Sequence, residues 1–299
     1  MSILQEKVKG VEDRIKIKEY LKENLGLSTR LIRSASKDQR ISVNDIVVRM
    51  NYMIKNNDII KIDLEKDEGQ DITPEKMDLN IVYEDDDILV LNKRPFMIVH
   101  PTKNYQNGTL ANGVLNYFQE TDQKCIVRLV SRLDMNTSGL IIIAKNQFSH
   151  GMLSKNMKEK VQKRYLAIVH GNLKDKEGTI DLPIYRPEGI EYGTMRIVDE
   201  RGQRSITHYK VIESFKDGDL VECLLETGRT HQIRVHLSHL GHPIYGDTLY
   251  GHGEEEEDLI KRQALHAYGL DFNSPRTGEL LSLRADLPED MTELLQKIK

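Results

Sequence analysis

The chain has no tryptophan, only two cysteines in 299 residues, and no long apolar run. Cys125 and Cys223 are too few for a disulfide framework and too far apart in sequence for a closely spaced thiolate metal site. Residues 140–144 form the longest strongly apolar stretch, which is far too short to cross a bilayer. The N-terminal residues alternate charged and apolar side chains and lack the apolar core of a secretory signal. We therefore expect a protein of the reducing cytoplasm that does not enter a membrane.

Charge is divided unevenly along the chain, whose 38% hydrophobic content can support the cores of two domains. Residues 1–64 hold 13 basic and 9 acidic side chains, residues 65–87 hold 2 and 10, and the rest is neutral, which gives −4 overall. A basic surface attracts polyanions such as nucleic acid, although this excess is also ordinary for a solvated helical surface. We predict an N-terminal domain over 1–64, an acidic linker over 65–77 with little that could join a core, and a second domain over 78–299.

Short periodic segments predict a compact α+β unit at the N-terminus. Residues 14–25 carry apolar side chains at helical spacing, and Ser28 is placed to cap a second helix over 29–36. Residues 40–48 alternate around an Asn-Asp pair, which indicates a β-hairpin. The second helix and its end present three basic side chains to solvent, namely Arg30, Arg33 and Lys37.

The second domain is rich in short apolar segments that are typical of strands. They are residues 87–92, 125–130, 140–144, 164–169 and 221–225. Strands outnumber helices and most connections have hairpin length, so we predict an α+β fold in which helices pack on a mainly antiparallel, mixed sheet.

Asp134 lies in a short polar loop directly before the apolar strand over 140–144. A carboxylate at the mouth of a buried strand, beside Arg132 and several hydroxyl groups, is suited to act as a nucleophile or general base. The alternative is that Asp134 only caps the turn, as aspartates beside Ser and Thr commonly do.

Apolar residues at helical spacing predict a helix over 230–240, which Gly241 ends. Arg234 lies one position from the apolar stripe, where its guanidinium can reach a carboxylate or remain in solvent. Tyr165 lies on a predicted strand, and the pattern alone indicates only a core tyrosine.

Histidines are concentrated around the same helix and raise the question of a metal site. His231, His236, His239 and His242 lie within twelve positions, but the helical i, i+4 spacing of zinc ligands is missing. The segment also has no acidic residue between Glu226 and Asp247, so we expect no metal here and favour hydrogen-bonding or phosphate-contacting roles.

Taken together, these segments resemble the RluA-type pseudouridine synthases (RluC/RluD-like), which isomerise uridine in RNA. The family signature H-R-L-D-x-x-T-S-G-L-x-x-x-A-K is matched at residues 132–145, with Ser131 where His is usual. Further blocks resemble the family in order at residues 87–101, 163–171, 228–246 and 265–270 with 275–279. Residues 14–62 also resemble the RNA-binding domain of ribosomal small-subunit protein four, with Asp45 at the usual glycine of the hairpin.

The resemblance implies the pseudouridine synthase fold and a role for each matched residue. Asp134 matches the nucleophilic aspartate, and whether it attacks ribose, attacks the base or removes a ribose proton stays open. Arg234 matches the arginine that pairs with it, and Tyr165 matches the tyrosine placed to remove the C5 proton. The residues we expect to contact RNA are Arg132, Thr137, Arg229 and His231, with Arg30, Arg33, Lys37 and Arg40 in the N-terminal domain.

The reaction is neither a redox reaction nor a hydrolysis, so we expect no cofactor. We expect RNA as the only partner of a monomer, with large-subunit ribosomal RNA favoured and transfer RNA as the alternative. Two other functions compete with this interpretation: a non-catalytic RNA-binding protein with the synthase fold, and a metal-dependent hydrolase built on the histidine-rich helix.

Overall fold

The N-terminal region has its own small sheet and its own core. The computed structural model describes residues 2–11, 13–66, 68–189 and 193–299, and in it this sheet has the strand order β1-β6-β3-β4. The elements of the region are β1 (Ile3–Lys7), β2 (Ile15–Lys16), α1 (Ile17–Glu23), α2 (Thr29–Lys37), β3 (Ile41–Val43), β4 (Ile46–Val47), β5 (Met53–Ile54) and β6 (Ile59–Asp63).

Local sequence signals explain how these elements begin and turn. The Ser28 hydroxyl accepts a hydrogen bond from the Leu31 amide at 3.2 Å and caps α2, as predicted. Helix α1 is shorter than predicted, because residues 15–16 pair with β5 instead. Asn44 and Asp45 both have positive φ, 49° and 67°, which is the conformation of the two-residue turn that suits a twisted hairpin.

The acidic connector is not a free linker. Asp67 lies outside the described residues, but the chain beyond it runs along α3 (Leu110–Glu120). The Gln70 side chain exchanges two hydrogen bonds with the backbone of Val127, at 2.8 and 3.1 Å. Ile72 is buried in the core beneath α3. The prediction that this segment contributes little to a core is therefore wrong for Ile72.

The second region is built on one large sheet with the order β12-β15-β16-β11-β17-β10-β8-β7, to which β18 and β9 are added at the side. Its pairs are antiparallel except that between β10 and β17. The strands are β7 (Ile81–Glu84), β8 (Ile88–Lys93), β9 (Arg128–Leu129), β10 (Ser138–Ala144), β11 (Val161–His170), β12 (Glu177–Asp181), β15 (Ile206–Ser214), β16 (Gly218–Leu225), β17 (Leu265–Asn273) and β18 (Leu280–Arg284), with a separate pair β13 (Ile184–Tyr185) and β14 (Ile197–Val198).

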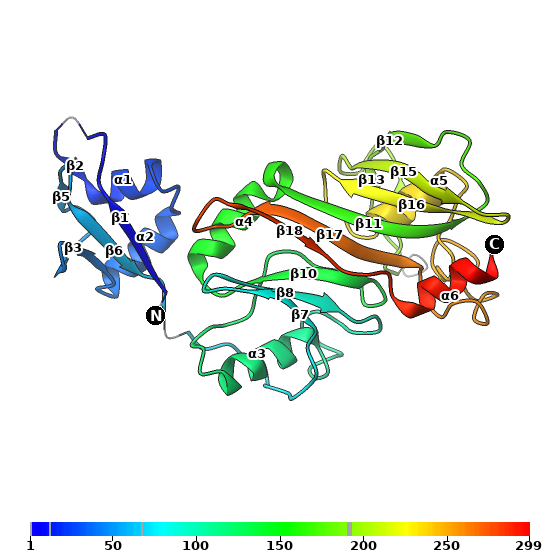
Figure 1. Cartoon of the computed structure of the whole chain (residues 1–299), viewed down its shortest axis with the longest axis horizontal. Coiled ribbons are helices and arrows are strands. Elements are labelled where there is room, and N and C mark those ends of the chain that lie inside the picture. The colour runs from blue at the N-terminus through cyan, green and yellow to red at the C-terminus, as the bar shows by residue number, and fades with distance from the viewer. Residues whose placement is uncertain (1, 12, 67, 190–192) are drawn as a thin grey trace.

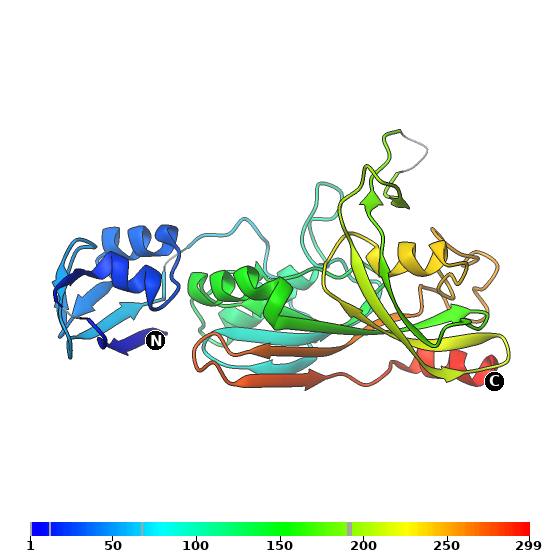
Figure 2. The same cartoon turned by 90° about the horizontal axis from the view of Figure 1, so that it is seen from above.

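Helices cover both faces of this sheet (Figures 1 and 2). Alternate residues of β8 and β10 point to opposite faces of the sheet. Ile141 of β10 packs in the core under α3, whereas Ile142 packs in a separate core with Leu153 of α4 (Gln147–Lys160). Helices α5 (Gln232–His239) and α6 (Glu289–Lys297) cover the other end through a third core. The α+β fold with a mainly antiparallel sheet is thus confirmed. No helix of the described residues combines the length and apolar character needed to cross a bilayer.

One predicted strand is mostly absent. Of residues 125–130, only Arg128–Leu129 pair in the sheet. The amide of Val127 is instead bound by the Gln70 side chain, so the connector occupies the hydrogen-bonding edge that a longer strand would use.

Helix α4 joins the two regions. Phe148 is buried in the N-terminal core and Met152 packs against the same core. Arg276 pairs with the buried Asp87 at 2.7 Å and also donates to the carbonyl of Ile3 at 2.6 Å. Figure 2 shows α4 next to the N-terminal helices. The N-terminal region therefore rests on the large domain through both apolar and ionic contacts.

Candidate active site

Asp134 lies in the loop that leads into β10. The loop closes with a hydrogen bond from the Thr137 amide to the Asp134 carbonyl at 3.1 Å, and the Asp134 side chain is 30% exposed. Gly139 follows with φ +113°, and a Cβ at this position would lie 2.3 Å from the Ala267 carbonyl oxygen. Only glycine allows this close approach to β17, where the parallel pairing of β10 with β17 begins. The Ser-Gly pair thus determines where the loop ends and the buried strand starts.

Arg234 connects Asp134 to a second, fully buried carboxylate. Its Nη1 lies 3.3 Å from Asp134 Oδ2, while Nε and Nη2 pair with Asp247 at 2.6 and 2.7 Å. Asp247 also accepts the backbone amides of Leu249 and Tyr250 at 3.0 and 3.1 Å. A bidentate pair fixes the plane of a guanidinium. Asp247 therefore aims the remaining edge of Arg234 at Asp134.

The start of α5 is shaped by two polar residues. His231 adopts a left-handed conformation, φ +59°, at the N-cap position, and its Nδ1 lies 2.8 Å from the Tyr250 hydroxyl. Its Nε2 lies 3.8 Å from Asp134 Oδ2. Burial lowers the pKa of His231, and Asp134 opposes that effect. Gln232 accepts from the Arg229 amide at 3.0 Å and donates to the Ile206 carbonyl at 2.9 Å, which fixes the loop before the helix.

Tyr165 belongs to the wall of a small pocket of about 60 Å³ around Asp134. It lies on β11, is 8% exposed, and lines the pocket with Asp134 and Arg234. Burial raises the pKa of Tyr165, and the nearby Asp134 raises it further, so the phenol is neutral at physiological pH. The other lining residues are Arg132, Leu133, Thr137, Leu225, Arg229, His231, Gln232, Ile233 and Leu265.

Two buried cations hold the Asp134 loop from behind. The Lys93 ammonium donates to the carbonyls of Arg94, Met97 and Met135 at 2.9, 3.1 and 3.0 Å. Burial and the charge of Arg262 lower the pKa of Lys93 to about 7, and Asp134 opposes the shift. Arg262 donates to the Asn136 carbonyl at 3.3 Å.

Arg262 is also fixed from its other side. It is fully buried and pairs bidentately with Asp290 of α6 at 2.6 and 2.8 Å. The sequence patterns do not reveal Lys93, Arg262 and Asp247 as part of the site. Their charge alone predicts solvent exposure, and only the fold brings them to this loop.

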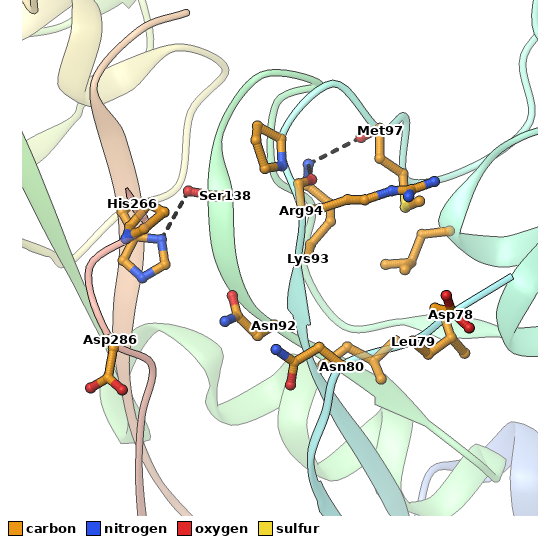
Figure 3. A pocket seen from close by; sticks show the side chains of 14 residues that line it. Asp78, Leu79, Asn80, Asn92, Lys93, Arg94, Met97, Ser138, His266 and Asp286 are labelled. Carbon is orange, nitrogen blue, oxygen red and sulfur yellow. Dashed lines mark hydrogen bonds between the residues drawn. The ribbon is translucent and has the colours of Figure 1, made fainter. Parts of the chain in front are cut away.

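A larger cavity of about 440 Å³ lies beside this loop and has Lys93 in its wall. Figure 3 shows the Ser138 hydroxyl pointing to His266, 2.9 Å away, on one side and Lys93 with Met97 on the other. Asp134, Tyr165 and Arg234 do not line it. The candidate catalytic side chains thus line the small pocket around Asp134 and not the larger cavity.

The predicted RNA-contacting residues fall into two sets. Arg132 is exposed at the rim of the pocket, whereas Thr137 is only 2% exposed and accepts a hydrogen bond from Gln263 at 3.2 Å. The N-terminal set lies away from this pocket: Arg30, Arg33 and Lys37 are exposed, but Arg40 is half-buried, with its guanidinium donating to the Asp63 carbonyl at 2.6 Å.

Two histidines of this histidine-rich segment bind oxygen atoms of the protein. His236 is buried between the Thr207 hydroxyl and the Leu182 carbonyl, at 2.9 and 3.0 Å, and His242 lies 2.8 Å from the His170 carbonyl. Within the described ranges, no group of three or more His, Cys, Asp or Glu side chains is arranged to hold a metal ion.

Comparison with known proteins identifies the class. Residues 87–239 match the family model described as RNA pseudouridylate synthase. The chain is 41% identical over 286 residues to the uncharacterized RNA pseudouridine synthase YjbO of Bacillus subtilis (strain 168), covering 94% of this chain and 98% of that one. It is 35% identical over 272 residues to the ribosomal large subunit pseudouridine synthase D of Haemophilus influenzae, covering 87% and 83%.

The solved structure of human RNA pseudouridylate synthase domain containing 1 is similar with a TM-score of 0.58 and 28% identity, over 74% of this chain and 94% of that one. The chain belongs to the RNA pseudouridylate synthase family. More closely, it is an RluA-type enzyme that acts on RNA, as the sequence motifs predicted.

Proposed function

We propose that this enzyme isomerises uridines of large-subunit ribosomal RNA, with Asp134 as the nucleophile, Arg234 as its partner and Tyr165 against the base. The observation that carries the proposal is the chain of contacts from the buried Asp247 through Arg234 to a partly exposed Asp134 in an open pocket. Two relatives of 35–39% identity bear the name ribosomal large subunit pseudouridine synthase D, which supports this choice of RNA.

The reaction breaks the bond from C1′ to N1, joins C1′ to C5, and moves one proton from C5 to N1, so nothing is oxidised or hydrolysed. Arg234 forms an ion pair with Asp134 at 3.3 Å and so orients the carboxylate, whichever atom the carboxylate attacks. Because the raised pKa of Tyr165 favours its protonated form, the phenol can accept the C5 proton only if it gives up its own proton in the same step, and the reaction balances when one proton ends on N1.

RNA must also be held while the uridine leaves its stack, which costs a few kcal/mol. Arg132, Arg229 and His231 line the pocket and are positioned for such contacts. Thr137 fits a role in holding the loop better, because its hydroxyl is buried.

We also infer that residues 1–64 form an RNA-binding domain like that of ribosomal small-subunit protein four. A groove of about 490 Å³ runs between the end of α2 and the strand β4 region. Arg33, Lys37 and Arg49 line it and are exposed, so their charges are available to a phosphate backbone.

The decisive experiment is Asp134→Asn, which preserves size and removes the charge. We expect pseudouridine formation in a large-subunit ribosomal RNA transcript to fall by at least about 1,000-fold. The affinity for RNA should stay within roughly twofold of wild type, and the melting temperature within roughly 2 °C. A transfer RNA transcript serves as the second substrate arm. Normal yield in the variant would disprove the role of Asp134, and preference for transfer RNA would disprove the proposed target.

A further inference from the structure

An exposed phenylalanine beside the Asp134 loop has an unusual backbone. Phe96 has φ +60° in the turn over residues 94–97, and its side chain is 57% exposed. Pro95 precedes it, so the turn has proline at its second position and a left-handed residue at its third, where glycine is the residue without steric cost.

The other non-glycine residues with positive φ make this conformation stand out. Within the described part of the chain they are all polar or histidine: Gln39, Asn44, Asp45, Asn57, Asp122 and His231. Asn and Asp tolerate the left-handed region because their short polar groups bind the local backbone, whereas an aromatic side chain does not. Burial does not compensate Phe96, because most of its surface is in solvent.

The turn that carries Phe96 is tied to the residue after Asp134. Met97 donates its amide to the Met135 carbonyl at 3.2 Å, and the Lys93 ammonium binds the carbonyls of Arg94, Met97 and Met135, the first two of which bracket Phe96. Figure 3 shows Lys93 below this turn, with Met97 beside it. The turn that carries Phe96 is therefore held against the residue that directly follows Asp134.

A second exposed apolar side chain lies close by. Met135 is 44% exposed and directly follows Asp134. Arg132, two residues before Asp134, lines the pocket together with Arg229, so apolar and cationic side chains both occur in the neighbourhood of Asp134. This combination suits single-stranded nucleic acid, whose bases stack on aromatic rings while the phosphates bind basic groups.

We propose that Phe96, supported by Met135, is a positioning residue that stacks on the nucleobase next to the target uridine when that uridine is extruded. The extruded uridine leaves its neighbour without a stacking partner, and the exposed ring of Phe96 takes the place of that partner. The proposal rests on the proposed function in one respect: it takes Asp134 as the reacting centre.

The first test compares Phe96→Gly with Phe96→Tyr on a large-subunit ribosomal RNA transcript. Glycine removes the ring and relieves the backbone, so thermal stability is expected to equal or exceed that of wild type. KM is expected to rise about tenfold or more, with kcat changed much less, and Phe96→Tyr should restore the wild-type KM. A KM within twofold of wild type for Phe96→Gly overturns the proposal, as does an equal loss in Phe96→Tyr.

The absence of tryptophan makes a second, direct test possible. In Phe96→Trp the only indole should be quenched when the RNA transcript binds, because a base covers it. Ile212→Trp is the matched control, since Ile212 is similarly exposed, at 52%, but lies on β15, which pairs with β12 and β16 and not with the Asp134 loop. Quenching that is equal in both variants, or absent from Phe96→Trp, contradicts the proposal.

The wild-type enzyme is measured in parallel on the ribosomal and transfer RNA transcripts. A wrong choice of RNA appears as failure of the wild type on the ribosomal transcript, and the Phe96 variants are then compared on the transcript that the wild type modifies. A wrong role for Phe96 appears only in the variants, so the two failures are distinguishable.

Discussion

The active-site region and the N-terminal region use their basic side chains in opposite ways. Around Asp134, the cations Lys93, Arg234 and Arg262 are buried, and each binds several protein oxygens. On the N-terminal region, Arg33 and Lys37 are exposed on a groove. Cations of the first kind set the position of a loop, and those of the second kind are free to bind a polyanion. Arg40 is the exception in the N-terminal region, because its guanidinium holds the backbone at Asp63.

Among the changes that test this contrast between buried and exposed cations, the largest effect should come from removing the buried partner of Arg234. In Asp247→Asn the guanidinium loses one of its two carboxylates and turns, so Asp134 is no longer aligned. We expect activity to fall by about 100-fold, mainly in kcat. Arg234→Lys should show a similar loss, because one ammonium cannot replace a planar fork that bridges two carboxylates.

Steady-state kinetics and melting curves together characterise both variants. Asp217→Asn is a control for loss of a carboxylate elsewhere, since Asp217 forms no ion pair with the residues that the structure describes. A wild-type kcat in Asp247→Asn would mean that the alignment of Arg234 does not matter for catalysis. The buried cations would then have no catalytic role that sets them apart from the exposed cations of the N-terminal region.

A second effect should appear in the pH dependence of stability. The pKa of Lys93 is lowered to about 7 in the folded chain, below its value in the unfolded chain. Between these two values the unfolded chain binds more protons, so the free energy of unfolding rises with pH, by at most about 1.4 kcal/mol per pH unit. Below the folded value, the cost of the buried charge is fully present.

Lys93→Met should lose this slope above pH 7, whereas Lys37→Met, at an exposed position, should keep it. Urea unfolding at a series of pH values measures the difference. Parallel curves for wild type and Lys93→Met would mean that the three carbonyls hold the ammonium protonated over the whole range.

The smallest effect concerns the groove on the N-terminal region. Changing Arg33, Lys37 and Arg49 together to Gln should weaken binding of structured RNA and reduce the salt slope of log K by roughly one for each phosphate that is no longer neutralised. Activity on a short oligonucleotide should change little. Changing Arg40 to Gln should instead lower the melting temperature, because its side chain holds the backbone.

Filter binding at several salt concentrations checks the change in slope. Charge removal is a cleaner experiment than deletion of residues 1–64, which would expose Phe148 and Met152 on α4. An unchanged salt slope would show that the groove does not bind RNA, and the two regions would no longer differ in the way described.

The sequence predicted best what local patterns determine. The Ser28 cap, the Asn44-Asp45 turn and the strand that became β10 follow from residues adjacent in the chain. The contact between Asp134 and Arg234, 100 positions later in the chain, was also predicted, but only because both residues match the motifs of a family. The spacing of apolar residues on α5 alone did not decide whether the Arg234 side chain points to solvent or to the core.

The parts that were missed depend on contacts between distant segments. Residues 125–127 are apolar enough for a strand, but the Gln70 side chain takes the Val127 amide. Lys93 and Arg262 have charges that normally remain in solvent, and three carbonyls or a carboxylate of α6 are what make their burial possible. No spacing rule relates those partners, so only the fold could identify them.

The apolar face that α4 presents to the N-terminal core has a consequence for how the molecule melts. Phe148 belongs to the interior of one region while its own helix covers the sheet of the other, and Arg276 joins Asp87 to the first strand. Neither half can lose its order without uncovering apolar surface on the other. The two regions should therefore unfold together, in a single calorimetric transition. The same contacts should keep any RNA bound in the N-terminal groove at a fixed distance from Asp134.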